Sequence, residues 1–349
     1  MEQPKDYKRY KTIFLVLTAA IFIWGIIGAL DITQIPYSGY NSSADRTVTL
    51  VREGSPAAQA GLRVGDTITH IDGIPIDDNA TLSTRDRPAI NSEGSLTVTR
   101  GGTEQTLSFK YSSQPAVNMI AGTGATTLTG LAFLILGLMA YLRNATRMST
   151  RFCALSLLFA ALLFNGPYIA SSAQRRIVDG ITIMLLTILF AAILDYCLNF
   201  PRAKNVITAR PWLRQAVYVI NGAFGVALAT ITITTPPMNA RRTGILFLGF
   251  SLIFGGSILL SVIAVIHSYI KASSEERTAT GLNIMLVGIV VGFAPLLLSI
   301  IARLVNPHLG ELPGEQFYGI TLIALPIGMA MALMKLEPAG AKVGERATA

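Results

Sequence analysis

The chain has 349 residues, of which 51% are hydrophobic and 14% are charged, and its mean hydropathy is +0.52. Soluble globular domains carry about 25% charged residues, so this composition excludes a wholly soluble protein and requires long uncharged runs. The net charge is +8 at pH 7, but the Lys and Arg residues lie mostly in short clusters between apolar runs, where positive charge sets membrane orientation. We therefore expect a protein of the lipid bilayer with no nucleic-acid partner.

Eight apolar runs are long enough, at roughly 20 residues, to be membrane-spanning helices. The first, residues 12–30, follows the basic segment 1–11 and has no clean small-residue cleavage site, so we expect an uncleaved anchor. The other seven predict a helical bundle over residues 116–335. They lie within residues 116–142, 152–170, 177–200, 215–235, 243–270, 282–301 and 317–334.

The loop cations predict the orientation of these spans. With a cytoplasmic N-terminus, the cytoplasmic segments hold 16 Lys and Arg residues and the short segments on the other side hold 5, in agreement with the positive-inside rule. The fold class is then a polytopic α-helical protein of the plasma (inner) membrane with both termini cytoplasmic. Residues 336–349 are expected to be a solvated cytoplasmic tail, and the polar segment 36–112 to be extracytoplasmic.

This polar segment predicts short strands and turns. Alternating residues indicate strands at 47–51, 66–72, 95–100 and 106–111, with a hairpin joining the last two. Ser55 has the side chain of a helix N-cap, Pro56 suits the first helical position, and Gly61 suits the helix end.

GSPAAQAGLRVGDTITHIDGIPI, residues 54–76, resembles the PDZ signature GSPAxxAGLxxGDxIxxIDGxPI. The residues that carry the resemblance are Gly54, Ser55, Pro56, Gly61, Leu62, Gly65, Asp66 and Gly73. It implies one α+β PDZ domain inserted between the first two spans. Such a domain binds a peptide or protein C-terminus as an added strand, with backbone N–H groups holding the carboxylate.

The PDZ resemblance also implies where the ligand would bind. The carboxylate loop is best matched by YSGY, and the second groove wall by the polar run DDNATLSTRDRPAI at 77–90, which departs from an apolar-faced helix. The implied peptide-binding residues are Tyr37, Ser38, Gly39, Tyr40, Leu82 and Ile90. Two alternatives stay open: a peptide-binding groove, or a degenerate PDZ domain that docks on its own membrane part or on a partner subunit.

Three membrane stretches complete a second resemblance: LDYCLNFPR at 194–202, a charged loop and glycine-bearing span at 268–298, and LIALPIGMAMALMK at 322–335. With the anchor and the PDZ motif, residues 1–336 resemble the membrane sensor module of PDZ-containing bacterial histidine kinases, the quorum-sensing competence type among them. The family often has His where this chain has Asp195, and a different run where this chain has TATG. We expect no kinase effector within residues 336–349.

The sensor resemblance implies signalling roles near the inner ends of the spans. The candidate residues are Asp195, Phe200, Pro201, Arg202, Glu275, Glu276 and Arg277. An ionisable group inside a span is a functional hypothesis by default. The alternative for Asp195 is an interfacial carboxylate that pairs with Arg202 or another loop cation.

No enzyme motif accompanies these features. His70, His267 and His308 are far apart and none is followed by Glu, so the HExxH zinc motif is absent, as is a Walker A motif. Asp179 and Asp195 lie roughly 24 Å apart at opposite ends of one helix, too far for a catalytic pair. We expect no catalytic residue, no metal and no cofactor.

The sequence therefore predicts a non-enzymatic sensor. Its extracytoplasmic PDZ domain would bind a peptide or protein tail and signal through the bundle to a separate cytoplasmic kinase, cyclase or phosphatase. The alternative is a PDZ scaffold that tethers an envelope protein or a protease at the membrane. A transporter is a third reading, but the internal repeat and the several polar spans it requires are not evident.

Overall fold

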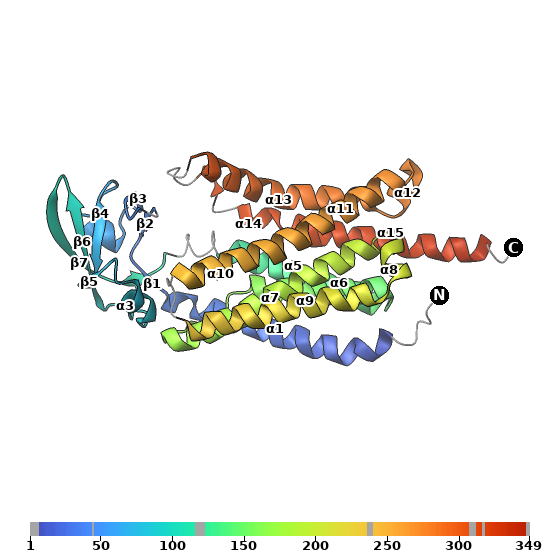
Figure 1. Ribbon diagram of the computed structural model, residues 1–349, viewed down its shortest axis with the longest axis horizontal. Coiled ribbons are helices and arrows are strands. Elements are labelled where there is room, and N and C mark those ends of the chain that lie inside the picture. Colours follow the sequence, from blue (N-terminus) through green and yellow to red (C-terminus); the bar gives the residue numbers. More distant parts are fainter. Residues whose placement is uncertain are drawn as a thin grey trace.

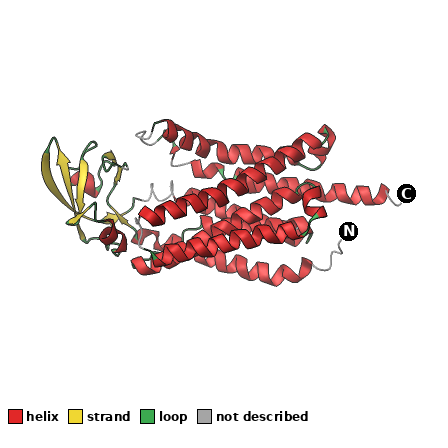
Figure 2. Cartoon of the chain, viewed as in Figure 1, coloured by secondary structure: helices red, strands yellow, loops and turns green. Residues whose placement is uncertain are grey.

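The computed structural model describes residues 7–43, 45–115, 123–235, 240–306, 312–315 and 318–346. A small β-rich domain lies at one end of the molecule, and long helices extend from it as a bundle (Figure 1). Figure 2 shows that the strands are confined to this domain. Several predicted features lie outside the described residues: residues 1–6, the starts of two spans at Ala116 and Phe317, His308, and residues 347–349.

The β domain occupies residues 36–113. Its strands form a four-stranded antiparallel sheet in the order β5-β4-β6-β7 and two strand pairs, β2-β3 and β1-β8. The strands are β1 (Pro36–Tyr37), β2 (Tyr40–Ser42), β3 (Val48–Val51), β4 (Thr67–Ile71), β5 (Ile74–Pro75), β6 (Glu93–Arg100), β7 (Thr103–Lys110) and β8 (Ser112–Ser113). Two short helices, α2 (Pro56–Gln59) and α3 (Asn79–Thr84), complete the domain.

Alternation along β6 explains how the sheet builds its core. Leu96 and Val98 point inward and are 1% and 0% exposed, whereas their neighbours in the strand are half-buried. The predicted hairpin is present, but its turn consists of only Gly101 and Gly102, both at positive φ. A two-residue turn of this kind matches the twist of the flanking strands, so Thr103 already pairs with Arg100 and β7 starts three residues earlier than predicted.

The long helices form the bundle, with α7 at its centre. α7 packs against α6, α9 and α11, while α5 packs against α6 and α13 against α15. The long helices are α1 (Lys11–Asp31), α5 (Ala125–Arg143), α6 (Arg147–Leu163), α7 (Ser172–Asn199), α9 (Trp212–Thr234), α10 (Ala240–Phe250), α11 (Gly256–Lys271), α13 (Leu282–Val305) and α15 (Ala324–Arg346). Shorter segments join them: the 3-10 turns Tyr7–Tyr10 and Ile32–Gln34, α8 (Asn205–Ala209), the π-helical turn Ser251–Gly255, α12 (Ser274–Ala279) and α14 (Tyr318–Thr321).

Within the described residues, seven helices are long and apolar enough to cross a membrane, which indicates a membrane-embedded protein. These spans are Lys11–Gln34, Ala125–Arg143, Ser172–Asn199, Trp212–Thr234, Gly244–Lys271, Leu282–Ser299 and Tyr318–Leu336. The count of eight stays a prediction, because the third expected span corresponds to α6, which has 17 residues and begins at Arg147.

Two helices end away from the borders of their predicted segments. The third span was expected within residues 152–170, and α6 ends at Leu163, just before the run Asn165-Gly166-Pro167. Gly and Pro are both poor helix formers, so this run favours the chain leaving the helix. The expected tail after residue 335 is helical as far as Arg346, because α15 continues there. Extending a helix that is already nucleated adds one hydrogen bond per residue.

Candidate peptide-binding site and its connection to the bundle

The signature residues of the β domain build its scaffold. Ser55 caps α2 by accepting a hydrogen bond from the Ala58 N–H over 3.2 Å, and Pro56 is the first residue of the helix, as predicted. Leu62 is 4% exposed in the domain core. The four signature glycines all have positive φ, which suits turns that other residues adopt poorly: Gly54, Gly61, Gly65 and Gly73. These signature residues therefore shape the turns and the core of the domain.

Asp66 links the signature to the far strand. Its carboxylate accepts hydrogen bonds from Arg100 Nε and Nη2, both over 2.7 Å, and from the Arg63 N–H over 2.8 Å. The Arg100 guanidinium therefore holds the pKa of the Asp66 carboxyl below its usual range, and the Arg63 N–H adds to this effect. Since Asp66 is 2% exposed, the pair fastens the turn before β4 to the end of β6.

The predicted carboxylate loop, Tyr37 to Tyr40, lies against α2. The Ser38 carbonyl accepts the Ala57 N–H over 3.0 Å, and the Gly39 carbonyl accepts the Arg52 N–H over 2.9 Å. Gly39 has φ +85°, and a Cβ atom at this position would lie 2.1 Å from Ser55 Cβ. Glycine is therefore required here by both the backbone conformation and the close approach of α2.

The strand that follows this loop presents an open edge. Arg52 bonds to Gly39, so Tyr40 and Val51 are a non-hydrogen-bonded pair of the β2-β3 ladder. The main-chain N–H and C=O of Tyr40 consequently point away from β3. Among the described strands, β2 pairs only with β3. This edge has the geometry that an added peptide strand requires.

The Tyr40 side chain is half-buried, in a part of the domain that also contains a charged pair. Asp72, in the turn after β4, binds Arg85 over 2.6 Å, and both side chains are 24% exposed. Burial, with smaller effects from Tyr111 and Asp72, raises the pKa of Tyr40 to about 12. The phenol is therefore neutral at physiological pH.

Helix α3 lies within the run predicted as the second groove wall, and it is polar as its sequence indicates. Asp78 caps it by accepting the Thr81 N–H over 3.1 Å, which lowers the Asp78 pKa. The helix has no buried residue. Leu82 and Ile90, the two predicted apolar contacts, are half-buried and lie outside the core cluster of the domain. Side-chain selectivity at this wall must therefore come mainly from polar contacts.

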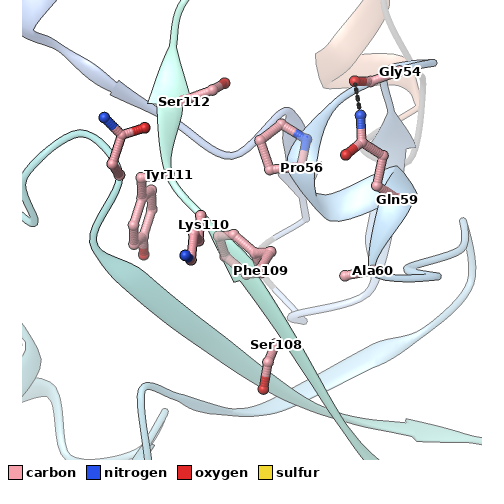
Figure 3. A pocket seen from close by; sticks show the side chains of 10 residues that line it. Gly54, Pro56, Gln59, Ala60, Ser108, Phe109, Lys110, Tyr111 and Ser112 are labelled. Carbon is pink, nitrogen blue, oxygen red and sulfur yellow. Dashed lines mark hydrogen bonds between the residues drawn. The ribbon is translucent and has the colours of Figure 1, made fainter.

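A pocket of about 480 Å³ lies on a different part of the domain, between α2 and the end of β7 (Figure 3). None of the six predicted peptide-binding residues lines it. Its walls are formed by Gly54, Pro56, Gln59, Ala60, Asn91 and residues 108–112. Lys110 is the one charged residue among them, which makes this pocket a useful control site.

The segment after α3 is bonded to the start of α7. Ser172 Oγ donates to the Thr84 carbonyl over 2.6 Å, and the Ser172 N–H donates to Asp86 Oδ1 over 2.7 Å. Arg175 Nη2 donates to the Arg85 carbonyl over 3.1 Å. The β domain therefore holds the first turn of the central helix of the bundle.

The connection between α6 and α7 adds to this junction. The Arg87 N–H donates to the Ala170 carbonyl over 3.0 Å, and Tyr168 Oη donates to the Pro88 carbonyl over 3.3 Å. The Tyr168 N–H also donates to Asp31 Oδ2 over 3.2 Å, at the end of α1. Sequence reasoning missed this junction, because its partners are about 80 to 140 residues apart and only the adjacent cations Arg175 and Arg176 marked the region.

At the other end of α7, Asp195 lies in a buried cluster. Its carboxylate accepts hydrogen bonds from Arg151 Nε over 2.9 Å and from Asn199 Nδ2 over 3.1 Å, and it forms an ion pair with Arg214, whose Nε lies 3.1 Å away. The Asp195 side chain is 4% exposed, and its partners are two other cations of the predicted cytoplasmic loops, Arg151 and Arg214, rather than Arg202. Arg202 instead pairs with Glu276 over 3.0 Å.

The remaining predicted signalling residues surround this Arg202–Glu276 pair. Phe200 is 1% exposed and precedes Pro201 through a cis peptide bond, whereas Glu275 is exposed on α12. Arg277 stacks on the Tyr269 ring at 4.0 Å. The structure thus brings the loop after α7 and helix α12 together, as a surface next to the buried Asp195 cluster.

Sequence reasoning did not single out Lys204, which ties this end of α7 to α11. Its ammonium group donates to the carbonyls of Cys197 and Phe200 over 3.0 and 3.2 Å, and to Ser268 Oγ over 2.6 Å. A cation near a helix C-terminus is a recognised sequence signal, and Lys204 satisfies carbonyls that the helix leaves unpaired. The end of α7 is therefore connected to α6, α9 and α11 by polar contacts.

Comparison with known proteins supports the assignment of the β domain. Residues 47–84, from β3 to the end of α3, match the family model of the PDZ domain. The chain carries a PDZ domain. No curated protein and no solved structure matches the chain. PDZ domains bind peptide C-termini, which is the general kind of partner that this domain suggests.

Proposed function

We propose that this protein is a membrane receptor without catalytic activity. Its PDZ domain binds the C-terminal tail of a peptide or protein, and α7 carries the bound state to the opposite end of the bundle. There, a separate kinase, cyclase or phosphatase reads the change at Arg202 and at Glu275–Arg277.

The orientation in this proposal rests on the loop charges and on the course of the chain. Loop Lys and Arg residues favour the side away from the PDZ domain as cytoplasmic. Helix α1 begins and α15 ends at that same end of the bundle (Figure 1). With α6 counted as an eighth crossing, this arrangement supports an even number of crossings and a PDZ domain outside the cytoplasm of a bacterial plasma membrane.

One observation carries the signalling part of the proposal: Ser172 and Arg175 of α7 hold the residues that follow α3 in the PDZ domain. Helix α7 is 28 residues long, from Ser172 to Asn199, and carries Asp195 near its other end. Because a helix is a stiff element, a shift at its first turn moves its far end. A ligand can shift the equilibrium between two arrangements of α7 only if it binds one arrangement more tightly than the other, and the difference in affinity limits the shift.

The same contacts weigh against a PDZ domain that only docks on its own membrane part. The junction uses residues 84–88, whereas the outer edge of β2 pairs with no described strand. Docking and peptide binding therefore use different parts of the domain. Within the junction, Arg85 pairs with Asp72 through its side chain and accepts the bond from Arg175 through its carbonyl.

Peptide binding is tested with the full chain in lipid nanodiscs. Peptides with free C-termini are selected on it by display, and each is then measured as the free acid and as the C-terminal amide. We expect the amide to bind at least about tenfold more weakly, because hydrogen bonds to a charged group contribute about 1.5–3 kcal/mol. Equal affinities of the free acid and the amide would contradict binding at the β2 edge. Equal losses of peptide affinity in Gly39→Ala and in the control Lys110→Ala would contradict it as well.

A further inference from the structure

The Asp195 cluster carries more positive than negative charge. Arg151 and Arg214 both direct Nε to the one carboxylate of Asp195. Among the described residues, no other carboxylate forms an ion pair with either arginine.

The helices themselves increase this positive potential. Arg151 is the fifth residue of α6 and Arg214 the third of α9, so both lie near helix N-termini, where the helix dipole is positive. Neither helix has an acidic residue in its first turn. Cations are the unfavourable choice at such positions, and an anion is the favourable one.

An unsatisfied donor marks the place. The Arg151 side chain is 7% exposed, and its buried Nη2 atom has no hydrogen-bond partner. A buried charged donor without a partner costs several times more free energy than an ordinary hydrogen bond contributes. Arg214, in contrast, is 42% exposed, and its ion pair with Asp195 through Nε leaves the two Nη atoms of the guanidinium for another ligand.

We propose that Arg151, Arg214 and the N-terminal ends of α6 and α9 form a binding site for a phosphate-bearing anion, supplied by the headgroup of an anionic phospholipid. Trp212, two residues before Arg214, is 59% exposed, as expected of a tryptophan at the boundary between bilayer and water. Phosphate headgroups are the abundant anions at this depth, and the planar guanidinium matches phosphate oxygens. The site does not depend on what the PDZ domain binds.

The purified full chain in a neutral detergent provides the test. Its thermal unfolding midpoint is measured with phosphatidylglycerol, with phosphatidylcholine of the same acyl chains, and with inorganic phosphate. We expect phosphatidylglycerol to raise the midpoint by at least about 3 °C more than phosphatidylcholine does. Arg214→Gln should remove this difference, and Arg214→Lys should retain part of it.

Arg202→Gln is the matched control, because Arg202 lies at the same end of the bundle and also has an acidic partner. It should keep the full phosphatidylglycerol effect. Native mass spectrometry should show phosphatidylglycerol bound to the wild type and lost from Arg214→Gln. A midpoint shift with inorganic phosphate equal to that with the lipid would support the anion site and assign it to a soluble phosphate. Equal midpoints in the two lipids, or an unchanged lipid effect in Arg214→Gln, would overturn the proposal.

Discussion

Ser172, the first residue of α7, donates its hydroxyl hydrogen to the carbonyl of Thr84, the last residue of α3, over 2.6 Å. These residues are 88 positions apart in the chain. One belongs to the longest helix of the described bundle and the other to the PDZ domain. The bond therefore makes the start of α7 part of the domain that would bind a ligand.

Removing this junction should loosen the PDZ domain from the bundle. In Ser172→Ala/Arg175→Ala, the bonds to Thr84 and Arg85 are lost, and each contributes about 1 kcal/mol. We expect amide hydrogen exchange in residues 84–88 to accelerate about tenfold or more. Thr182→Ala is the control, because that hydroxyl bonds only within α7, to the Val178 carbonyl. Equal exchange in the two variants would contradict the role of the junction.

Gly39→Ala should disrupt the loop before β2. The new Cβ would meet Ser55 Cβ at 2.1 Å, at a residue with φ +85°. Gly102→Ala is a matched control, since Gly102 has φ +83° but nothing within 4 Å of the position of its Cβ. Both variants carry a backbone cost of about 1–2 kcal/mol, and only Gly39→Ala adds the clash. We expect a larger loss of PDZ stability and of peptide affinity in Gly39→Ala, measured by hydrogen exchange and by fluorescence anisotropy.

The Asp66–Arg100 pair should make PDZ stability depend on acid pH. Because Arg100 lowers the pKa of Asp66 in the folded state, the pair stabilises the domain above the unfolded value of about 4. This contribution is lost as the pH falls through the lower folded pKa. Arg100→Gln should lower the opening free energy of β4 by about 1.5–3 kcal/mol at pH 6 and flatten its acid dependence. Amide exchange, corrected for the intrinsic rate at each pH, measures this.

Arg46→Gln serves as the control for that experiment. Arg46 pairs with Asp77, whose side chain is 79% exposed. Ion pairs at the surface contribute about 0–1 kcal/mol, so this variant should retain nearly the full stability and the acid dependence of the wild type. An acid dependence that is unchanged in Arg100→Gln would contradict the assignment to Asp66.

Neutralising Asp195 and neutralising Glu276, both at the end of the bundle opposite the PDZ domain, should have different effects on stability. Asp195→Asn leaves the Arg151 side chain, 7% exposed, without its counter-charge, and breaking a buried pair costs about 3–5 kcal/mol. Glu276→Gln affects Arg202, which is 79% exposed, and should cost under about 1 kcal/mol. The thermal unfolding midpoint in detergent should fall clearly for Asp195→Asn alone. Equal midpoints would mean that the cluster is not buried in solution.

Local sequence signals predicted much of the PDZ domain and most of the bundle. The Ser55 cap bonds to a residue three positions away, and the β6-β7 hairpin forms around two adjacent glycines, so short segments contain all the information. Length and apolar composition likewise sufficed for the long helices. The end of α6 at Leu163 was also signalled, by Pro167, but the apolar residues around that proline masked it.

The connections between distant segments could not be predicted in this way. Arg151 is 44 residues from Asp195, and which cation reaches the carboxylate depends on how α6, α7 and α9 pack. Several cations of the same predicted membrane side were equally plausible partners, and Arg202 is closer in sequence. The bond between Ser172 and Thr84 is similar, because it depends on where the PDZ domain lies on the bundle.

Transmission through α7 is the central claim, and hydrogen exchange of the full chain in nanodiscs tests it most directly. A display-selected peptide is added as the free acid, and exchange is followed in residues 200–204 and 272–280, at the end opposite the PDZ domain. We predict that the peptide changes this exchange in the wild type, and that Ser172→Ala/Arg175→Ala still binds the peptide without the change. A peptide that protects β2 but leaves both distal segments unchanged in the wild type would contradict the receptor mechanism and leave a PDZ scaffold.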